Sequence, residues 1–310
     1  MKDYFNFSLT GKKFFPIWIL FLLCFAAPYM TLLLKMTSFR QGGTSPALIF
    51  PILILLFLVA FVFSFYMAKL MIENVIFKDM PVKFSGSFGE FLWKVILGLF
   101  LTIITIGIYM AWFIADLQRY FVNNSSYDSE SLEFKGKGGK LFVILLLTLM
   151  LPMIVLIALM PMLIIGHPEN AKMVGLLFQI VMVIVLVPYI YCFYKWMVNI
   201  SYKGYIISWE TKFWNSCAKI AMEIILSIVT VGIFAPLAMV RLYEYFADRT
   251  YAISGDAKLK FGYEIDQLND FLFIWGQILL TIITLSVYYP WAYCKIRSRI
   301  LSKTYLIHLT

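Results

Sequence analysis

Three ionisable residues inside apolar segments are the candidates for chemistry in this chain. Lys94 and Lys219 occupy equivalent positions in two similar segments, and Glu223 follows Lys219 by four residues. That spacing places Lys219 and Glu223 on one face of a helix, where they can form an ion pair. Ionisable groups at membrane depth are costly and often functional, so Lys94, Lys219 and Glu223 are the candidate functional polar residues. The alternative is that both lysines extend to a nearby headgroup layer, because each lies near the start of its segment.

Two rows of hydroxyl side chains recur in the same segments: Thr102, Ser227 and Thr281, with Thr105, Thr230 and Thr284. Helix packing and hydrogen bonding to carbonyl groups of their own helices is the preferred interpretation. A path for a polar solute is the alternative.

The chain shows no residue pattern typical of catalysis or of metal binding. Its two histidines, His167 and His308, are not clustered, and no HExxH or GxSxG motif occurs. The four cysteines, which form no CxxC pair, are Cys24, Cys192, Cys217 and Cys294. We therefore expect no enzyme, no catalytic, cofactor-binding or metal-binding residue, and no cofactor.

The composition is that of a membrane protein. Of the 310 residues, 62% are hydrophobic and only 14% are charged, whereas soluble domains hold about 25% charged residues. This balance excludes a secreted disulfide domain, a disordered tail and a nucleic-acid-binding domain. The formal net charge of +9 comes from basic residues that flank apolar stretches, which is typical of charge that sets membrane topology.

Four apolar stretches are long enough to cross a bilayer as helices, and three others are shorter. The long stretches are Phe14–Leu34, Ala47–Ala68, Leu141–Ile165 and Met173–Trp196. The short ones are Phe91–Tyr109, Ser216–Phe234 and Phe271–Tyr288. Prolines inside the long stretches predict kinks.

The short stretches are copies of one another. Residues 101–112 read LTIITIGIYMAW, residues 226–237 read LSIVTVGIFAPL, and residues 280–291 read LTIITLSVYYPW. Further matches at offsets of 125–127 predict a first membrane repeat at residues 1–126 and a second at 127–250. Residues 251–310 would then hold an extra copy of the short helix–break–helix element.

Small patches with strand character separate the apolar segments. They are Phe5–Leu9, Val75–Phe77 with Val82–Ser85, Leu132–Lys135, Ile200–Tyr202 with Tyr205–Trp209, Leu259–Tyr263 and Thr304–His308. The predicted fold class is therefore an all-α polytopic membrane protein with internally duplicated helices, kinked or re-entrant elements and short cytoplasmic β-strands.

The distribution of Lys and Arg favours short elements that enter and leave the membrane on one side. If all seven segments cross, the two sides carry 12 and 14 basic residues, and the positive-inside rule indicates no orientation. If only the four long segments cross, 23 basic residues lie inside and 3 outside. The breaks would lie near Gly107, Gly232 and Ser286. Seven ordinary spans remain the alternative, because 18 or 19 apolar residues can also cross.

The motifs resemble those of the YjgN-like family of bacterial inner-membrane proteins. The carrying residues are FSGSFGEF at 84–91 with the LTIITIGIYMAW run, and, in the last copy, Tyr288, Pro290, Trp291, Ala292 and Lys295. The second copy of the first motif keeps Phe134, Gly136, Gly138, Gly139 and Phe142. Ala111, Leu237 and Asp116 depart from the family pattern. The resemblance implies a bacterial inner-membrane location and no particular activity.

Two functions from different classes follow as expectations. The first is transport, or lipid or small-solute handling, across or within the membrane, because internal duplication is common in transporters. The alternative is a structural or accessory protein that binds an envelope protein or a membrane-associated peptidase. We expect a multi-pass protein of the inner (cytoplasmic) membrane with both termini cytoplasmic. Its expected partners are membrane lipids and, in the accessory role, another protein, but not nucleic acid.

Overall fold

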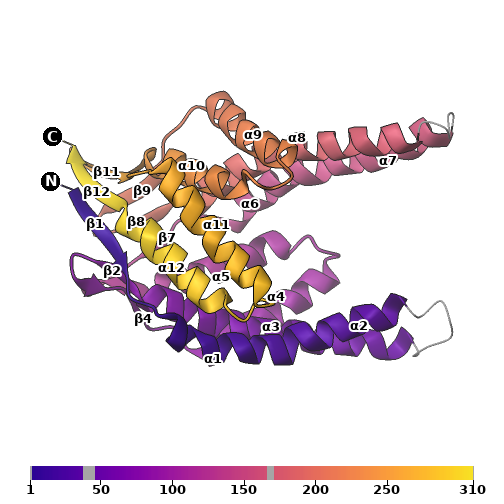
Figure 1. The fold of residues 1–310 in the computed structure, drawn as a ribbon, viewed down its shortest axis with the longest axis horizontal. Coiled ribbons are helices and arrows are strands. Elements are labelled where there is room, and N and C mark those ends of the chain that lie inside the picture. The colour runs from indigo at the N-terminus through magenta and orange to yellow at the C-terminus, as the bar shows by residue number, and fades with distance from the viewer. Residues whose placement is uncertain (1, 38–45, 166–170, 310) are drawn as a thin grey trace.

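The computed structural model describes residues 2–37, 46–165 and 171–309. His167, named above, and Arg40, one of the three basic residues assigned to the outside, lie outside these residues. The helices leave a curled β-sheet in one common direction, and both ends of the chain lie at the sheet (Figure 1). Two helical hairpins extend much further from the sheet than the others (Figure 1).

The element order repeats five times as strand, helical hairpin, strand. The first unit comprises β1 (Lys2–Phe7), α1 (Gly11–Phe21), a π-helical turn (Leu22–Ala26), α2 (Ala27–Thr37), α3 (Pro46–Glu73) and β2 (Val75–Phe77). The second comprises β3 (Met80–Pro81), β4 (Lys83–Phe84), α4 (Phe88–Ile104), α5 (Met110–Asn123) and β5 (Ser125–Tyr127). The third comprises β6 (Glu130–Ser131), β7 (Glu133–Phe134), α6 (Gly138–Leu145), a π-helical turn (Leu146–Met150), α7 (Leu151–Ile165), α8 (Ala171–Met197) and β8 (Ile200–Tyr202).

The last two units have short hairpins, as the second unit does. The fourth comprises β9 (Tyr205–Trp209), α9 (Phe213–Val229), α10 (Ala235–Ala247) and β10 (Thr250–Ser254). The fifth comprises β11 (Ala257–Tyr263), α11 (Gln267–Ile283), α12 (Tyr289–Ser302) and β12 (Thr304–Leu309). The predicted division at residues 126/127 and 250/251 falls within β5 and β10, and the division into domains stays a prediction.

The strands form two antiparallel sheets. The larger has nine strands in the order β3-β2-β1-β12-β11-β10-β9-β8-β7, and the smaller has the order β4-β5-β6. The first and last strands pair, with Tyr4 opposite Tyr305. The Tyr127 hydroxyl donates to the Phe77 carbonyl and the Tyr202 hydroxyl to the Tyr127 carbonyl, so the smaller sheet is joined to both ends of the larger one.

The predicted all-α class is therefore wrong. The predicted short strand patches are present, and they join into the two hydrogen-bonded sheets. The reason is that every helical hairpin returns to the side from which it left, which brings consecutive strands edge to edge. The pairing of β1 with β12 joins residues about three hundred positions apart, and no local pattern indicates it.

The same device closes the base of every helical hairpin. The strand that precedes each hairpin ends on a buried aromatic residue. The N–H of the next residue donates to the carbonyl of a residue just after the last helix of the hairpin, at 2.9–3.0 Å. The aromatic residues are Phe7, Phe84, Phe134, Trp209 and Tyr263. The hydrogen-bonded pairs are Ser8–Asn74, Ser85–Asn124, Lys135–Asn199, Glu210–Arg249 and Glu264–Lys303. Seven residues after each aromatic residue lies a side chain with at most 1% exposure: Phe14, Phe91, Leu141, Ser216 and Asp270.

Contacts between successive helices close a ring above the sheet. The contacting pairs are α1–α12, α12–α11, α11–α10, α10–α9, α9–α8, α8–α6, α6–α5, α5–α4, α4–α3 and α3–α1. The hydrophobic clusters lie between neighbouring pairs, as where Phe91 and Val95 of α4 pack against Phe65 of α3 and Phe113 of α5.

Four helical segments are long and apolar enough to cross a membrane: Gly11–Leu34, Pro51–Glu73, Gly138–Met162 and Lys172–Met197. Only 6–12% of their most apolar windows is buried inside the protein, so most of these surfaces must face another apolar medium. The predicted irregularities near Pro28 and Pro152 take the form of the two π-helical turns, each of which ends two residues before its proline. This position suits a residue that lacks the N–H needed for a regular helix.

The three short hairpins turn at the predicted breaks. In the fourth unit, the Gly232 N–H donates to the Ser227 carbonyl at 2.7 Å, and Thr230 Oγ1 accepts from the Phe234 N–H at 3.0 Å. The equivalent bonds join Gly107 to Thr102, Tyr109 to Thr105, Ser286 to Thr281 and Tyr288 to Thr284. Both arms of each hairpin end at the sheet, so none of these elements continues as one straight helix.

The tips of the short hairpins are apolar and exposed. Ile106, Val231 and Leu285 are 94%, 91% and 86% exposed. Trp18 Nε1 donates to the Ser286 carbonyl at 2.8 Å, so the tip of the last hairpin reaches a point on α1 seven residues beyond Gly11. At 1.5 Å per residue this is about 10 Å, far less than the roughly 30 Å of bilayer hydrocarbon. This geometry suits hairpins that enter one leaflet from the sheet side and return.

The tip turn predicts opposite effects for two matched substitutions. Ser286 has φ 68° where Gly232 has φ +83°, and a left-handed conformation costs a non-glycine residue about 1 kcal/mol. We expect Ser286→Gly to raise the unfolding free energy by about that amount. Gly232→Ser should lower it similarly, because nothing within 4 Å of Gly232 would clash with a Cβ. Thermal unfolding of the purified protein measures both, and shifts in the same direction would contradict this account.

Candidate functional site

The centre of the fourth unit is a buried carboxylate with two cations. Glu223 of α9 is fully buried, and its Oε1 accepts from Lys219 Nζ at 2.6 Å and contacts Arg241 Nε of α10 at 3.1 Å. The side chains of Lys219 and Arg241 are each 24% exposed. One oxygen thus bridges two positive charges, and the cluster carries a net positive charge between the two arms of the hairpin.

The predicted pairing of Lys219 with Glu223 is present, and Arg241 is a third member that sequence reasoning missed. Arg241 lies on the other arm, 18 residues after Glu223, and only the turn at Gly232 brings it close. Lys94 does not belong to a comparable cluster. Its Nζ lies 3.6 Å from Glu90 in an exposed pair, and the position equivalent to Glu223 is Gly98, where the ring of Phe113 occupies the space a side chain would need. The functional role of Lys94, Lys219 and Glu223 stays a prediction.

The fifth unit joins its two arms at the equivalent positions without a carboxylate. Gln277 occupies the position of Glu223, and its Oε1 accepts from the Tyr288 hydroxyl at 3.1 Å. Lys295 occupies the position of Arg241, and its Nζ donates to the Tyr288 hydroxyl at 2.9 Å. The tyrosine hydroxyl therefore joins the two arms without any carboxylate.

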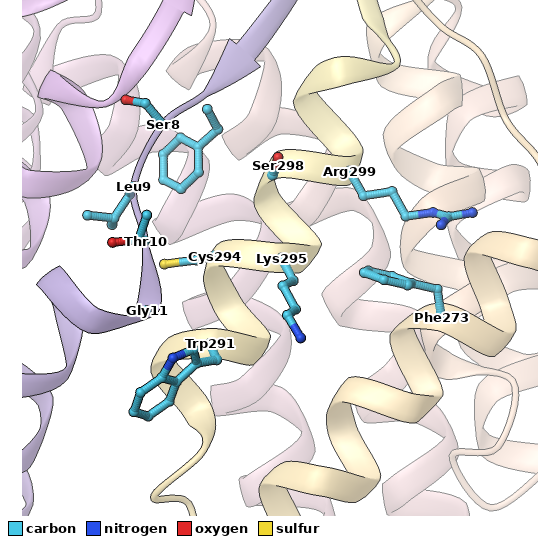
Figure 2. A pocket seen from close by; sticks show the side chains of 11 residues that line it. Ser8, Leu9, Thr10, Gly11, Phe273, Trp291, Cys294, Lys295, Ser298 and Arg299 are labelled. Atoms are coloured by element: carbon cyan, nitrogen blue, oxygen red, sulfur yellow. The ribbon is translucent and has the colours of Figure 1, made fainter.

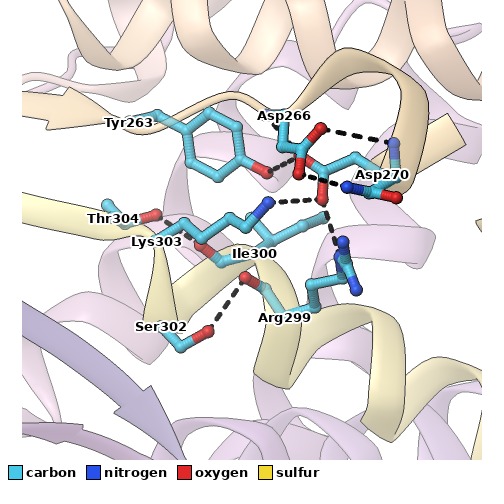
Figure 3. Close-up of polar contacts among 9 residues, drawn as sticks. Tyr263, Asp266, Asp270, Arg299, Ile300, Ser302, Lys303 and Thr304 are labelled. Atoms are coloured by element: carbon cyan, nitrogen blue, oxygen red, sulfur yellow. Dashed lines mark hydrogen bonds and ion pairs between the residues drawn. The ribbon is translucent and has the colours of Figure 1, made fainter. Parts of the chain in front are cut away.

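A second buried carboxylate lies at the base of the fifth unit (Figure 3). Asp270 is 1% exposed, and its Oδ1 accepts from Arg299 Nε and Lys303 Nζ at 2.6 Å each. Its Oδ2 accepts from the Tyr263 hydroxyl and the Asp266 N–H. Burial acts to raise the pKa of Asp270, but the hydrogen bonds from Lys303 and Arg299 outweigh it, and the pKa lies below its ordinary value. These bonds join α11, α12 and β11, so the cluster holds the last hairpin on the sheet.

Two cavities lie on opposite faces of α12. The inner cavity, about 600 Å³, lies between α10, α11 and α12 and is mostly apolar, with Tyr243, Gln277, Thr281 and Arg297 among its polar residues. The outer cavity, about 730 Å³, lies between α12, α11 and the segment that leads from β1 into α1 (Figure 2). At 100° per residue, Arg297 points to the inner cavity while Trp291, Lys295 and Ser298 point to the outer one.

The hydroxyl rows bond to their own helices, as the preferred interpretation predicted. Thr102, Ser227 and Thr281 each donate to the carbonyl four residues earlier, at 2.7–2.8 Å. Thr105, Thr230 and Thr284 do the same. Among the residues that the structure describes, no group of three His, Cys, Asp or Glu side chains could hold a metal ion.

Comparison with known proteins identifies relatives of this chain. A model of the family described as bacterial protein of unknown function (DUF898) matches residues 2–261. The inner membrane protein YjgN of Salmonella typhimurium is 30% identical over 99 residues, which cover 32% of this chain and 24% of that relative. No solved structure matches. The family match confirms the resemblance deduced from the motifs, and it ends before the hairpin of α11 and α12.

The bridged carboxylate predicts an unequal cost for two substitutions that each remove the carboxylate partner of a lysine. Glu223→Ala leaves two cations without their partner in a buried site, and we expect a loss of about 3 kcal/mol in unfolding free energy. Glu90→Ala removes the exposed partner of Lys94 and should cost about 0–1 kcal/mol. Lys219→Ala combined with Glu223→Ala should cost less than the sum of the single changes. Denaturant unfolding in detergent measures these values, and equal small losses for Glu90→Ala and Glu223→Ala would contradict the coupling.

Proposed function

Because the chain belongs to the DUF898 family and is a membrane protein, we propose that it handles a lipid or small amphiphile within the bacterial inner membrane, with both termini in the cytoplasm. The relative named above is an inner membrane protein, which supports the location. The orientation and the ligand class are argued below.

The charge distribution supports a cytoplasmic sheet. The 23 basic residues assigned to the inside belong to the sheet and the hairpins that return to it, whereas Lys35 and Lys172 lie near the far ends of the long hairpins. The third outside residue, Arg40, is not among the described residues. The paired β1 and β12 put both termini at the sheet. The positive-inside rule then favours a cytoplasmic position for the sheet and for both termini.

Reporter fusions test this orientation. A fluorescent protein that folds only in the cytoplasm, fused after Thr310, should be bright, and an alkaline phosphatase at the same point should be inactive. The matched insertion in the connection between α2 and α3, after Thr37 and before Pro46, should give the reverse. Phosphatase activity at the C-terminus would overturn the orientation.

The inner cavity supports amphiphile binding. Its walls are mostly aliphatic and aromatic, and a few polar groups converge on it, which is typical of small-molecule sites. Met239 and Ile282, which are 71% and 61% exposed, both line it, so the cavity has an apolar border toward the surroundings of the helices. A cavity that opens among such side chains is suited to a ligand that arrives from the lipid phase.

Arg297 supports an anionic or polar head on that ligand. Its Nε donates to the Tyr293 hydroxyl at 2.9 Å, and no carboxylate of the described residues lies within ion-pair distance of its guanidinium. A charge-assisted hydrogen bond from Arg297 would fix the head of the ligand, and the apolar walls would hold its tail. A lipid-derived carboxylate or phosphate with one acyl chain fits this division.

Binding of spin-labelled palmitate to the purified protein tests the proposal. Arg297→Ala should weaken binding about tenfold, the effect of losing one charge-assisted hydrogen bond. Arg297→Lys keeps the charge and should lose less. Ile278→Trp fills the cavity and should abolish binding while the protein stays folded. Unchanged affinity in both Arg297→Ala and Ile278→Trp would overturn the proposal and favour the accessory role.

A further inference from the structure

We propose that the outer cavity beside α12 is a second, separate site, which binds the phosphate headgroup of an anionic phospholipid at the membrane surface. Lys295 is its central cation, and the occupant is a lipid from the sheet-side leaflet. This site does not depend on the amphiphile cavity, which lies on the opposite face of the same helix.

The walls of this cavity combine cationic, hydroxyl and aromatic groups. Lys295, Ser298 and Arg299 of α12 line it together with Ser8 and Thr10, and the rings of Trp291 and Phe273 border it. Figure 2 shows that Lys295 and Arg299 extend from the side of α12 that faces away from Ser8 and Thr10. Ammonium, guanidinium and hydroxyl groups are donors to phosphate oxygens. The two rings supply apolar surface for the glycerol and the first carbons of the acyl chains.

The charge of Lys295 is not neutralised by any described residue. Lys295 Nζ donates to the Tyr288 hydroxyl, and no carboxylate of the described residues lies within ion-pair distance of it. Arg299, in contrast, is paired with Asp270 at 2.6 Å. Lys295 is therefore the positive charge at this cavity that a phosphate would offset.

Comparison of the three short hairpins singles out Lys295. The equivalent position in the second unit is Asp116, which pairs with Arg119 at 2.8 Å. The equivalent position in the fourth unit is Arg241, which pairs with Glu223. Lys295 is the one of these three equivalent side chains without a partner of opposite charge among the described residues. The charge at this position is therefore neutralised by an ion pair in the second and fourth units. In the fifth unit, beside the outer cavity, it has no counter-charge among the described residues.

The depth of the cavity matches the headgroup layer. Trp291 packs directly on Gly11, where an added Cβ would lie 2.4 Å from the indole, and Gly11 begins the first membrane-crossing segment. Lys12 and Lys13 follow at the same level. Tryptophan and lysine at the end of a span mark the membrane–water interface, where lipid phosphates lie. A zwitterionic head also carries a phosphate, but its ammonium group offsets the attraction to Lys295, so an anionic head is favoured.

Native mass spectrometry of the detergent-purified protein tests the site with phosphatidylglycerol as the probe. We expect Lys295→Ala to weaken binding at least fivefold, Lys295→Glu to abolish it, and Lys295→Arg to keep it within twofold. The matched control is Lys94→Ala, which removes a cation from another short hairpin and should leave binding unchanged. Phosphatidylcholine should bind at least fivefold more weakly than phosphatidylglycerol. Thermal unfolding confirms that each variant is folded.

Inorganic phosphate distinguishes the two sources of the headgroup chemistry. If millimolar phosphate leaves phosphatidylglycerol bound, the occupant is a lipid, as proposed. Equal binding of phosphatidylglycerol by Lys295→Ala and the wild type, equal binding of the two lipids, or displacement of the lipid by phosphate alone would overturn the proposal. None of these results would alter palmitate binding that depends on Arg297, so the two proposals fail separately.

Discussion

Each pair of helices is closed at its base by one backbone hydrogen bond, from the residue after a buried aromatic side chain to the carbonyl just beyond the second arm. This bond forces every hairpin to return to its point of departure. The strands on either side then lie next to each other, and the sheet and the ring of helices follow from that constraint. The aromatic residue shields the bond from water, which strengthens a backbone hydrogen bond and makes its loss costly.

The membrane imposes a second constraint on the same units. Unpaired backbone groups cannot face hydrocarbon, so a chain that enters without crossing must satisfy its own turn. The short hairpins do so with a local set of bonds, in which a threonine hydroxyl accepts from the N–H that follows the turn. The glycine at the second and fourth units and Ser286 at the fifth take the left-handed conformation that this turn needs. Apolar side chains cover the tips.

The polar residues vary on this common scaffold, and that variation locates the candidate sites. The position of Glu223 is occupied by Gly98 in the second unit and by Gln277 in the fifth. Glu223 pairs with Arg241, and Gln277 is hydrogen-bonded to Tyr288, which also accepts from Lys295. Buried carboxylates occur where cations can surround them, as at Asp270, so these clusters serve the packing of the hairpins. Arg297 and Lys295 are different, because each faces a cavity and has no carboxylate partner among the residues described. The fifth unit therefore holds both proposed ligand sites.

The sequence by itself determined what depends on near neighbours along the chain. Apolar length marked the four candidate spans, the repeated twelve-residue motif located the turns near Gly107, Gly232 and Ser286, and the i, i+4 spacing paired Lys219 with Glu223. Each of these features lies within one helix or one turn, where 3.6 residues per turn already define which residues meet. The family resemblance rested on the same short motifs.

Only the tertiary structure decided what depends on distant segments. The pairing of β1 with β12 joined the first and last of the predicted short strands in one sheet, and the hairpin turn brought Arg241 to Glu223. Arg299 and Lys303 reach Asp270 from 29 and 33 residues away, and the cavities on the two faces of α12 exist only because α1, α10 and α11 pack around it. Such contacts depend on the directions in which whole helices and strands leave the sheet. The spacing of residues within one helix or strand does not indicate those directions.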